Sequence, residues 1–523
     1  MAKVYAGTIL TVDEHDTVAR FLVEERGKIV YVGNELPERY SHAERIELGG
    51  RALAPSFVDT HEHLASFATF HAGLNVMDAR SNEQIMQMVS DFRNRSNANL
   101  LIAFGASPHS VSEGRLLSRE ELDAACPDKP FMMVKYDGHA CVVNSKLLEQ
   151  IDGQVKDLRG YHPDTGEMNQ EAFFAVSNHI TSSISIPDLV RNVQRAVDYV
   201  ASLGIGMVHT VSGVGFKGDL DISLEKWLAK SMQHGFQLRV FPQSMRVATA
   251  LRRKIPRIGG CFANALDGCF GSEDAALLEP YANDPSNSGV LYYDDETVCE
   301  FCVQAHRSNL QIEMHAIGDA AFEQAVRGLE SAYGYWPRSD PRHGIIHACL
   351  PTDAGLRRCA ELGIHFPMQT SFIGWPQEPD AYLERILGVE RAGRLNPLRT
   401  MWDMGITISA GSDAPCTDPD PIMWMERACN HTTPEQSLTP REALRMCTYN
   451  GYWTTFDEDE RGSLQEGKIA DMVVLSGNPY EVGAAGIGSL QVEQLLLAGK
   501  PYRNQSQGFA SALIMGLVGT GYC

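Results

Sequence analysis

The 523-residue sequence lacks any apolar run that approaches the roughly 20 residues needed to cross a bilayer. Its longest candidate, residues 509–518, is too short and contains Gly516. Met1-Ala2-Lys3-Val4 leads directly into a strand-like pattern, so we expect no secretory signal before the fold. These absences predict a cytoplasmic protein without a membrane segment.

The sequence is also poor in positive charge. Its 45 lysines and arginines are outnumbered by 66 aspartates and glutamates, which gives a net charge of −21. Such a charge repels phosphates and argues against nucleic acid as a partner. It is compatible with a small-molecule substrate that is neutral or cationic. Acidity that only keeps the protein in solution is the simpler explanation.

The cysteines form no regular framework. Twelve of them are scattered along the chain, and without a secretory signal we interpret them as reduced thiols. Cys299 and Cys302 form a C-x-x-C pair, but their segment has helical periodicity and no second pair at zinc-finger spacing. We therefore expect buried cysteines on a helix at this position.

Strand-like alternation marks both ends of the chain. It covers residues 4–33, and a similar composition returns at 462–479 and 492–504. Neither end has enough strands to close a core alone, so we predict one small β-sandwich built from residues 1–54 and 451–503. The apolar tail, residues 504–523, is expected to pack either on its own barrel or against a second subunit.

Between these ends, short apolar runs alternate with longer helical patterns. In "YVASLGIGMVHT" and "MWDMGITISAGSD", a helix ends in glycine and a buried apolar strand follows, which is the repeating unit of a parallel sheet. Eight such units predict an α/β fold, a (β/α)8 TIM barrel over residues 55–450 with a large insertion at about 65–200. A doubly wound open sheet is the alternative, but no Gly-rich phosphate loop follows the first strand. The eight runs are Phe57–Asp59, Leu100–Phe104, Phe131–Val134, Met207–Val208, Leu238–Phe241, Ile312–Met314, Ile345–Ile346 and Ile406–Ser409.

Histidines and one aspartate end several of these runs. In "FVDTHEHL" at 57–64, His61 and His63 are two residues apart and therefore point to the same side of a strand. His315, His347 and Asp413 end three other runs. Because catalytic groups of a barrel lie at the carboxyl ends of its strands, these five side chains are expected to meet. Four imidazoles and a carboxylate suit Zn²⁺ and tolerate Fe²⁺, Mn²⁺ or Ni²⁺.

The same segments, in this order, resemble the motifs of the amidohydrolase superfamily, most closely its YtcJ-like branch. They are "APSFVDTHEHL", "MHAIGDAAFEQAV", "RHGIIHACL", "AGSDAPCTDPDPI" and "GSLQEGKIADMVVL", with "DGHACVVNSKLLE" at 137–149 as a further match. The resemblance extends from residue 3 to about residue 500. It implies a β-sandwich from both termini, a metal-bearing barrel, hydrolysis of C–N bonds other than peptide bonds, and a homo-oligomer. It also implies that the metal ligands are His61, His63, His315, His347 and Asp413.

One family feature is missing. Many members carry a carboxylated lysine that bridges two metals, four residues before an Asp-Gly pair. In "GGCFANALDG" this position is Ala263, which cannot bind a metal. We therefore favour a single Zn²⁺, with two ions as the alternative if Glu171 or Lys135 takes the place of the bridge.

This resemblance also implies a mechanism. A metal-activated water attacks an amide of N-acyl or N-formyl type, and Asp413 carries the proton to the leaving nitrogen. His347 or His139 stabilises the oxyanion. The candidates for substrate contact are His209, Tyr136 and Asp267, although Asp267 could instead shape its own loop. The alternatives are a deaminase of a heterocycle or amidine, and a binding or regulatory protein without activity.

The ligand assignment is tested by His61→Ala and His347→Ala. Each substitution removes one imidazole, so both variants are expected to lose metal and turnover. Elemental analysis of the purified variants and a hydrolysis assay measure the two effects. Metal content and rate that stay at the wild-type level in either variant would refute the ligand set.

Overall fold

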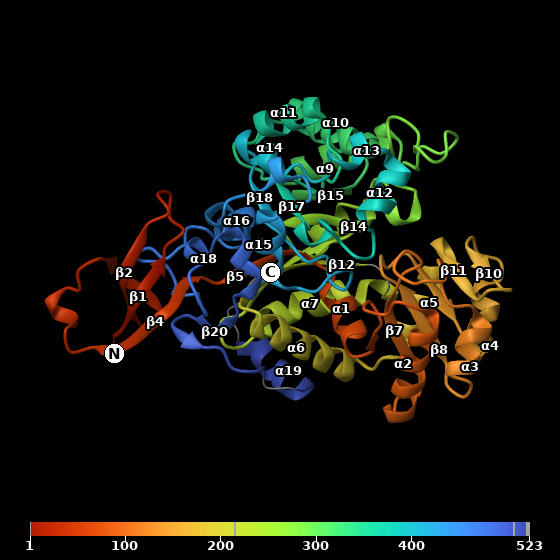
Figure 1. Cartoon of the computed structure of the whole chain (residues 1–523), viewed down its shortest axis with the longest axis horizontal. Helices are drawn as coiled ribbons and strands as arrows, with labels where there is room; N and C mark the ends of the chain where they lie inside the picture. The colour runs from red at the N-terminus through yellow and green to blue at the C-terminus, as the bar shows by residue number, and fades with distance from the viewer. Residues whose placement is uncertain (1, 214–215, 506–507, 519–523) are drawn as a thin grey trace.

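The computed structural model describes residues 2–213, 216–505 and 508–518 of a mixed α/β protein. Three parts lie along its longest axis (Figure 1). A sheet that contains the N-terminal strands lies at one end, the insertion lies at the other, and parallel strands with their helices lie between them.

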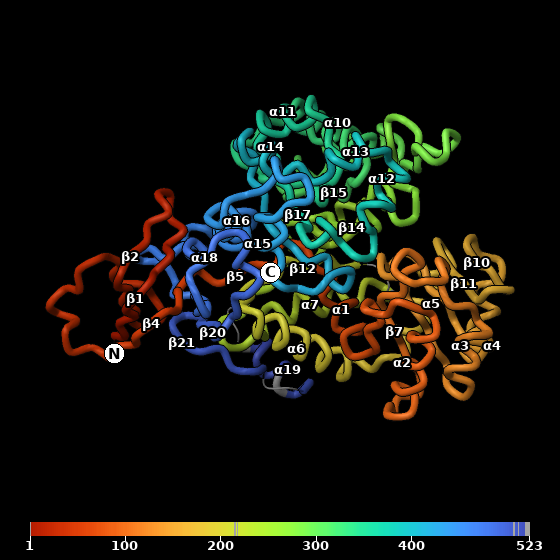
Figure 2. The backbone as a smooth tube through the Cα atoms, viewed as in Figure 1, coloured from red at the N-terminus to blue at the C-terminus, as the bar shows by residue number. Residues whose placement is uncertain are grey.

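The sheet at the first end contains strands from both termini of the chain. Its order is β21-β20-β19-β4-β1-β2-β3, and β4 pairs in parallel with β1 and antiparallel with β19. Figure 2 shows β20 and β21 beside the N-terminal strands. Strands from the two ends are hydrogen-bonded in one sheet because the 12-residue strand β4 pairs with both β1 and β19. The β-sandwich domain remains a prediction. The strands are β1 (Lys3–Leu10), β2 (Val18–Glu25), β3 (Lys28–Gly33), β4 (Glu44–Pro55), β19 (Met472–Leu475), β20 (Val492–Leu497) and β21 (Lys500–Pro501).

The insertion forms an α/β unit of its own after helix α1 (Leu64–His71). Its six strands lie in the order β10-β11-β9-β8-β7-β6, and separate clusters of buried apolar side chains accompany them. Ser81, Ser118 and Asn144 cap three of its helices with their side chains, as these residue types favour. Its elements are β6 (Leu74–Asn75), α2 (Asn82–Arg95), β7 (Leu101–Ala106), α3 (Arg119–Ala125), β8 (Phe131–Lys135), β9 (Ala140–Val143), α4 (Ser145–Val155), β10 (Tyr161–His162), β11 (Glu167–Asn169) and α5 (Gln170–Ser183).

Eight parallel strands form the centre of the molecule. They pair as three sheets, β5-β12-β13, β14-β15-β16 and β17-β18. β13 lies against β14, β16 against β17, and β18 against β5, so each sheet has the next as its neighbour. The strands are β5 (Phe57–Glu62), β12 (Ile205–Ser212), β13 (Gln237–Pro242), β14 (Arg257–Ala265), β15 (Gln311–Ala316), β16 (Gly344–His347), β17 (Phe366–Met368) and β18 (Ile408–Ala410).

Helices follow most of these strands, as the alternating pattern predicts. α6 leads into β12, and α7 to α17 cover the outside of the parallel strands (Figure 1). Their bounds are α6 (Ile186–Ser202), α7 (Leu220–Ser231), α8 (Ala248–Arg253), α9 (Asp295–Arg307), α10 (Asp319–Tyr335), α11 (Asp353–Leu362), α12 (Asp380–Leu387), α13 (Val389–Ala392), α14 (Leu398–Asp403), α15 (Pro421–Cys429), α16 (Pro440–Cys447) and α17 (Tyr449–Thr454), and α18 (Pro479–Gly486) lies between β19 and β20.

Two of the eight predicted runs belong elsewhere. Leu100–Phe104 and Phe131–Val134 fall in β7 and β8 of the insertion. Their places among the central strands are taken by β14 and β17. β17 lies in "CAELGIHFPMQ", where a helix that ends in glycine predicts a following strand. Gly259 and Gly260 interrupt the apolar pattern of β14, so β14 does not stand out as a strand in the sequence.

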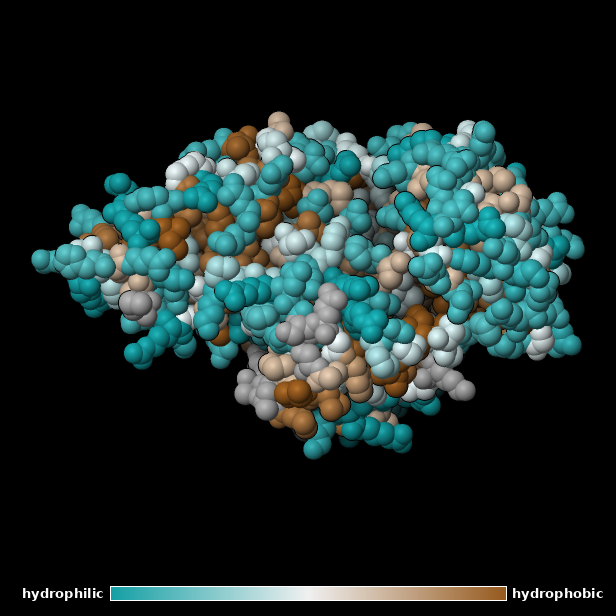
Figure 3. Space-filling view, turned by 90° about the horizontal axis from the view of Figure 1, so that it is seen from below, coloured by the Kyte–Doolittle hydropathy of each residue, from teal (hydrophilic) through white to brown (hydrophobic). Residues whose placement is uncertain are grey.

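The tail forms α19 (Phe509–Val518), which lies against α6 and α7 of its own chain. Leu513, Ile514 and Leu517 stay exposed, and Figure 3 shows hydrophobic residues gathered on this lower face. A homo-oligomer remains a prediction. Across the described ranges, no helix combines the length and the apolar character that a bilayer crossing needs.

A buried ion pair ties the end of the helical region to the parallel strands. Arg239 on β13 and Asp457, which follows α17, are almost fully buried, and Nε of Arg239 lies 2.9 Å from Oδ2 of Asp457. Asp457 also accepts a hydrogen bond from Thr455 at 2.8 Å. Loss of the Asp457 carboxylate would take an opposite charge away from the buried guanidinium of Arg239.

Asp457→Asn is therefore expected to cost roughly 3–5 kcal/mol of stability, because the Arg239 charge stays buried. A thermal unfolding midpoint that falls by several degrees would show this. The matched control is Glu149→Gln, which removes the carboxylate of the exposed Lys146–Glu149 pair and should leave the midpoint unchanged. Equal midpoints for both variants would contradict the prediction.

Candidate metal centre

Backbone hydrogen bonds hold the end of β5 against the loop after β18. The amide of Asp413 donates to the carbonyl of His61 at 2.7 Å, and the amide of His63 donates to the carbonyl of Ala414 at 3.0 Å. The Asp59 carboxylate accepts the amide of His61 at 3.1 Å. Asp413 itself has a φ of 56°, a left-handed conformation that turns the chain at this point. Side chains about 350 positions apart in the sequence therefore lie next to each other.

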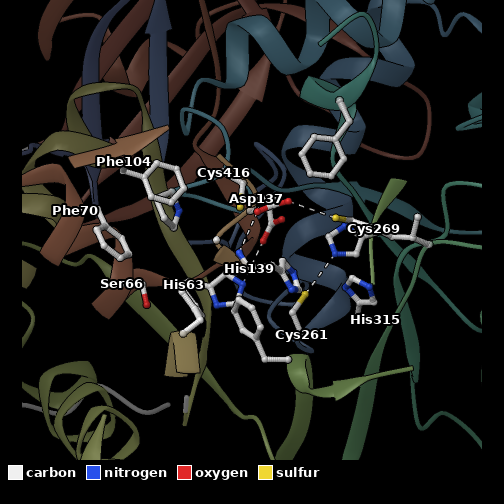
Figure 4. Close-up of a pocket in the computed structure, with 18 of the residues that line it drawn as sticks. His63, Ser66, Phe70, Phe104, Asp137, His139, Cys261, Cys269, His315 and Cys416 are labelled. Atoms are coloured by element: carbon white, nitrogen blue, oxygen red, sulfur yellow. Dashed lines mark hydrogen bonds and ion pairs between the residues drawn. The ribbon is translucent and has the colours of Figure 1, made fainter. Parts of the chain in front are cut away.

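Imidazole, thiol and carboxylate groups converge at this junction, and Figure 4 labels His63, Cys261 and His315 among them. Nε2 of His61 and Nε2 of His63 each lie 3.2 Å from Oδ1 of Asp413. Sγ of Cys261 lies 3.1 Å from Nε2 of His61 and 3.3 Å from Nε2 of His347. Two donor groups result, each with its donor atoms within 4.8 Å of one another. One consists of His61, His63, Cys261 and Asp413, and the other of Cys261, His315 and His347.

These spacings fit a bound cation. Ligand atoms about 2.0–2.3 Å from a tetrahedral Zn²⁺ are roughly 3.3–3.8 Å from one another. The separations of 3.1–3.3 Å in the structure lie at or slightly below the short end of that range. Oδ1 of Asp413 is buried beside Nε2 of His61 and Nε2 of His63. The donor atoms are arranged as they would be around an ion.

Second hydrogen bonds orient two of the imidazoles. Nδ1 of His347 donates to Oε1 of Gln369 at 2.6 Å, which leaves a lone pair on Nε2 facing Cys261. Nε2 of His315 donates to the carbonyl of Gly268 at 3.1 Å, while its buried Nδ1 has no hydrogen-bond partner among the described residues. Metal-binding histidines are held in this way, with one ring nitrogen fixed and the other free.

Burial sets the protonation states of the donors. It lowers the pKa of His61 and of His347, so both imidazoles are neutral as metal ligands must be. Burial disfavours the charge of Asp413, but hydrogen bonds with His61 and His63 outweigh it and hold the pKa of that carboxyl well below its usual range. Burial also raises the pKa of the Cys261 thiol, which a neighbouring cation would reverse.

Cys261 is the donor that the sequence prediction missed. It lies on β14, where the pairing with β15 shifts between Gly260 and Ala265 and Phe262 adopts a φ of 51°. Counting four residues back from Asp267-Gly268 leads to Ala263, but this irregularity makes Cys261 the residue that reaches the donors. A cysteine that ends the apolar stretch "RIGGC" was the available signal.

Glycines allow β14 to approach its neighbours closely enough for this. Gly259 has a φ of 135°, and a Cβ there would lie 1.8 Å from the carbonyl oxygen of Glu313 on β15. Gly260 has a φ of 132°, and a Cβ there would lie 2.8 Å from side-chain atoms of Gln243 and Val211. No larger residue fits either position without a shift of the strand.

The structure does not support Glu171 or Lys135 as a ligand that bridges two metal ions. Glu171 is at the surface, 2.9 Å from Arg159, and Nζ of Lys135 is 2.7 Å from Oδ2 of Asp137. Neither side chain belongs to a donor group. Each is already neutralised by a partner, which removes the reason to expect metal binding.

A cavity of about 130 Å³ adjoins the donors. His139 lies in its wall, with its ring centre 5.1 Å from that of Phe262, and the ring of His63 lies at the same distance on Phe262. The remaining wall is mostly apolar and aromatic. It includes Phe70, Phe104, Phe173, Phe174, Phe216, Phe270, Phe372 and Trp375.

The three predicted substrate contacts lie behind this wall. Tyr136 is buried and donates its hydroxyl to Oε1 of Glu378 at 2.9 Å. Asp267 accepts the backbone amides of Ile317 and Gly318 at 3.0 and 2.8 Å, which favours the alternative that it shapes its loop. His209 is buried with Nε2 3.3 Å from Oγ1 of Thr455, next to the Arg239–Asp457 pair. None of the three lines the cavity, so direct substrate contact is not supported for them.

Cys261→Ala tests the missed donor. Removal of a thiol that both donor groups share should lower metal content by more than the loss of any ligand that belongs to one group. The measurement is elemental analysis, together with the absorbance of the Co²⁺-substituted protein, in which a thiolate–metal charge-transfer band should disappear.

Cys349→Ala is the control, because Cys349 lines the same cavity but belongs to neither donor group. It should keep both metal content and the charge-transfer band. A Cys261→Ala protein with full metal content and an unchanged spectrum would exclude the thiol as a ligand.

Comparison with known proteins agrees with this geometry. A family model described as "Amidohydrolase family" matches residues 44–502. YtcJ of Bacillus subtilis (strain 168), which its name assigns to the amidohydrolases, is 25% identical over 95% of this chain and 98% of its own. The N-substituted formamide deformylase of Arthrobacter pascens is 24% identical over 92% and 95% of the two chains. An uncharacterized metal-dependent hydrolase of Pyrococcus horikoshii OT3 has the same fold, with a TM-score of 0.76 at 23% identity over 93% of this chain and 99% of that one.

Proposed function

We propose, since the chain belongs to the amidohydrolase family, that this enzyme is a metal-dependent hydrolase of small amides of N-acyl or N-formyl type. The observation that carries the proposal is the convergence of imidazole, thiol and carboxylate donors beside an apolar cavity. The similarity to a formamide deformylase over nearly the whole chain supports an amide as the bond that is cleaved. The net charge of −21 adds support for a substrate that is not an anion.

We also infer that the eight parallel strands close into a (β/α)8 barrel. The contacts β13–β14, β16–β17 and β18–β5 would complete the ring, and a parallel bridge between Gly344 and His365 supports the second of them. The donors then lie at the carboxyl ends of β5, β14, β15, β16 and β18. That is the end of such a barrel at which catalytic groups gather.

The donor set supports two ions, with Zn²⁺ as the best match. A single ion was favoured because Ala263 left no bridge, and Cys261 removes that reason. His61, His63, Cys261 and Asp413 would hold one ion, and Cys261, His315 and His347 would hold the other. Cys261 is common to both groups, so its thiolate would contribute to holding each ion.

Asp413 is the residue that we assign to proton transfer. A divalent ion at this centre would lower the pKa of a water molecule to about 7 and polarise the substrate carbonyl. Oδ1 of Asp413 lies beside His61 and His63, so Oδ2 is the oxygen that would accept the proton of the attacking water. The same oxygen then delivers the proton to the nitrogen that leaves.

His139 is the group that we assign to the oxyanion. It comes from the insertion and lines the cavity near the strand-borne donors, whereas His347 is already committed to Gln369 and to the donor group. An N–H from the ring of His139 would stabilise negative charge as it develops on the substrate oxygen. The insertion would in this way contribute directly to the chemistry.

Asp413→Asn should lower kcat by about 10²–10⁴-fold, because the amide cannot carry a proton at working pH. The rate of amine release from a panel of N-formyl and N-acyl amides measures this. Elemental analysis of the same sample separates lost proton transfer from lost metal. Asp128→Asn, which alters only the exposed pair with Arg93, should leave kcat unchanged.

The same panel separates the alternative activities. Ammonia release from purines, pyrimidines, triazines or amidines, without amide cleavage, would establish a deaminase instead. A metal-loaded protein that hydrolyses none of these compounds would bring forward a binding or regulatory role. A near-normal kcat for Asp413→Asn would exclude this residue as the proton carrier.

A further inference from the structure

Three separate segments hold one carboxylate at the wall of the cavity. Glu378 follows β17, lines the cavity and is partly exposed. Its Oε1 accepts the hydroxyl of Tyr136, from the end of β8 in the insertion, at 2.9 Å. Gly271, in the loop after β14, lies so close that a Cβ there would be 1.7 Å from the Tyr136 hydroxyl and 2.5 Å from Oε1 of Glu378. The pair therefore requires glycine at position 271.

A continuous row of rings connects this carboxylate to the metal donors. His347 stacks on Phe372 with ring centres 5.9 Å apart, and Phe372 stacks on Trp375 at 4.8 Å. Trp375 meets the ring of Tyr136 edge-on at 5.1 Å. An apolar or aromatic group that extends from the donors along this wall would reach Glu378 at its far end.

The lining of the cavity carries carboxylates but no cationic side chain. No lysine or arginine is among the described residues that line the cavity, and its carboxylates are Asp137, Glu378 and Asp413. Lys135, which is outside this lining, pairs with Asp137 at 2.7 Å and also favours the ionised form of Glu378, and Asp413 belongs to the donor group. Glu378 accepts the neutral hydroxyl of Tyr136 and a backbone N–H from Gly271, and no charged side chain of the lining pairs with it in the described part of the chain.

We propose that Glu378 is a specificity residue that binds a protonated amino group on the organic part of the substrate. This inference rests on the proposed amide hydrolysis and names its substrate class, an amide with an aromatic or apolar substituent that carries a basic nitrogen. The acyl carbon lies at the donors, the substituent lies along Phe372 and Trp375, and the ammonium group meets the carboxylate. Anionic substrates find no cation in the wall.

Electrostatics agree with this role. Burial raises the pKa of Glu378 to about 7, with the hydrogen bond from Tyr136 acting against it. A bound ammonium group would favour the ionised carboxylate and so lower that pKa. Burying a carboxylate beside aromatic rings costs stability, and a structural role alone would be served equally well by a neutral side chain.

A binding experiment tests the proposal without any need for catalysis. Phenethylamine is cationic at neutral pH, and phenethyl alcohol is its uncharged counterpart of similar shape. Isothermal titration of the full-length, metal-loaded protein should show that the amine binds about tenfold or more tightly than the alcohol, as a charge-assisted hydrogen bond provides. In Glu378→Gln the two ligands should bind about equally.

Two further variants keep the result interpretable. Glu378→Asp retains the charge and should keep a reduced preference for the amine, which guards against a general loss of structure in Glu378→Gln. Glu149→Gln removes an exposed carboxylate on α4 and should keep the full preference. A preference for the amine that survives in Glu378→Gln, or no preference in the wild type, would overturn the proposal.

The turnover experiment separates this inference from the proposed function. N-phenethylformamide is compared with its derivative that carries an aminomethyl group on the ring. The derivative should have the lower KM, with similar kcat, and Glu378→Gln should abolish the difference. Cleavage of both compounds with no effect of Glu378→Gln on KM would overturn the role of Glu378 and leave amide hydrolysis standing. A preference for the amine that depends on Glu378, with no cleavage of any amide, would support the role of Glu378 and overturn the proposed amide hydrolysis.

Discussion

The centre of this protein depends on the desolvation of charged and polar donors. His61, His347, Cys261 and Asp413 are buried within a few ångströms of one another, where little solvent reaches them. A carboxylate and a thiolate in such a place are stable only next to a cation. The strand ends, the backbone ties between β5 and the loop after β18, and the glycines of β14 all serve to keep these atoms together. The donor cluster therefore carries a large desolvation free energy, and for that reason it indicates that a cation binds here.

Sequence patterns predicted most of this arrangement. His61 and His63 could be placed because a strand projects alternate residues to one side, and His315, His347 and Asp413 because each ends an apolar run. Strand β14 was missed because Gly259 and Gly260 break the pattern by which strands are recognised. Cys261 was missed for the same reason, since an irregular strand changes the spacing to Asp267 that sequence counting assumes. The contacts of Glu171, Lys135 and His209 depend on tertiary neighbours that no local pattern reveals.

The two sources of the cavity wall differ in kind. The donors come from the ends of the parallel strands, whose positions are fixed by hydrogen bonds on both sides. His139, Phe173 and Phe174 come from the insertion, which has its own sheet and its own apolar clusters. Changes in the insertion can thus alter which substrate fits without moving the atoms that activate water. Glu378 lies where the two contributions meet, since it is held by a tyrosine of the insertion and a loop of the parallel strands.

The pairing of β4 with β19 has a consequence for biosynthesis. Residues 44–55 leave the ribosome early, whereas their antiparallel partner, residues 472–475, is among the last parts of the chain to be made. Until then one edge of β4 has no partner, and an unpaired strand edge is prone to associate with other chains. The first sheet that is translated is thus completed last. Nascent chains that stall before residue 472 would carry a nearly complete catalytic region and an open, adhesive edge.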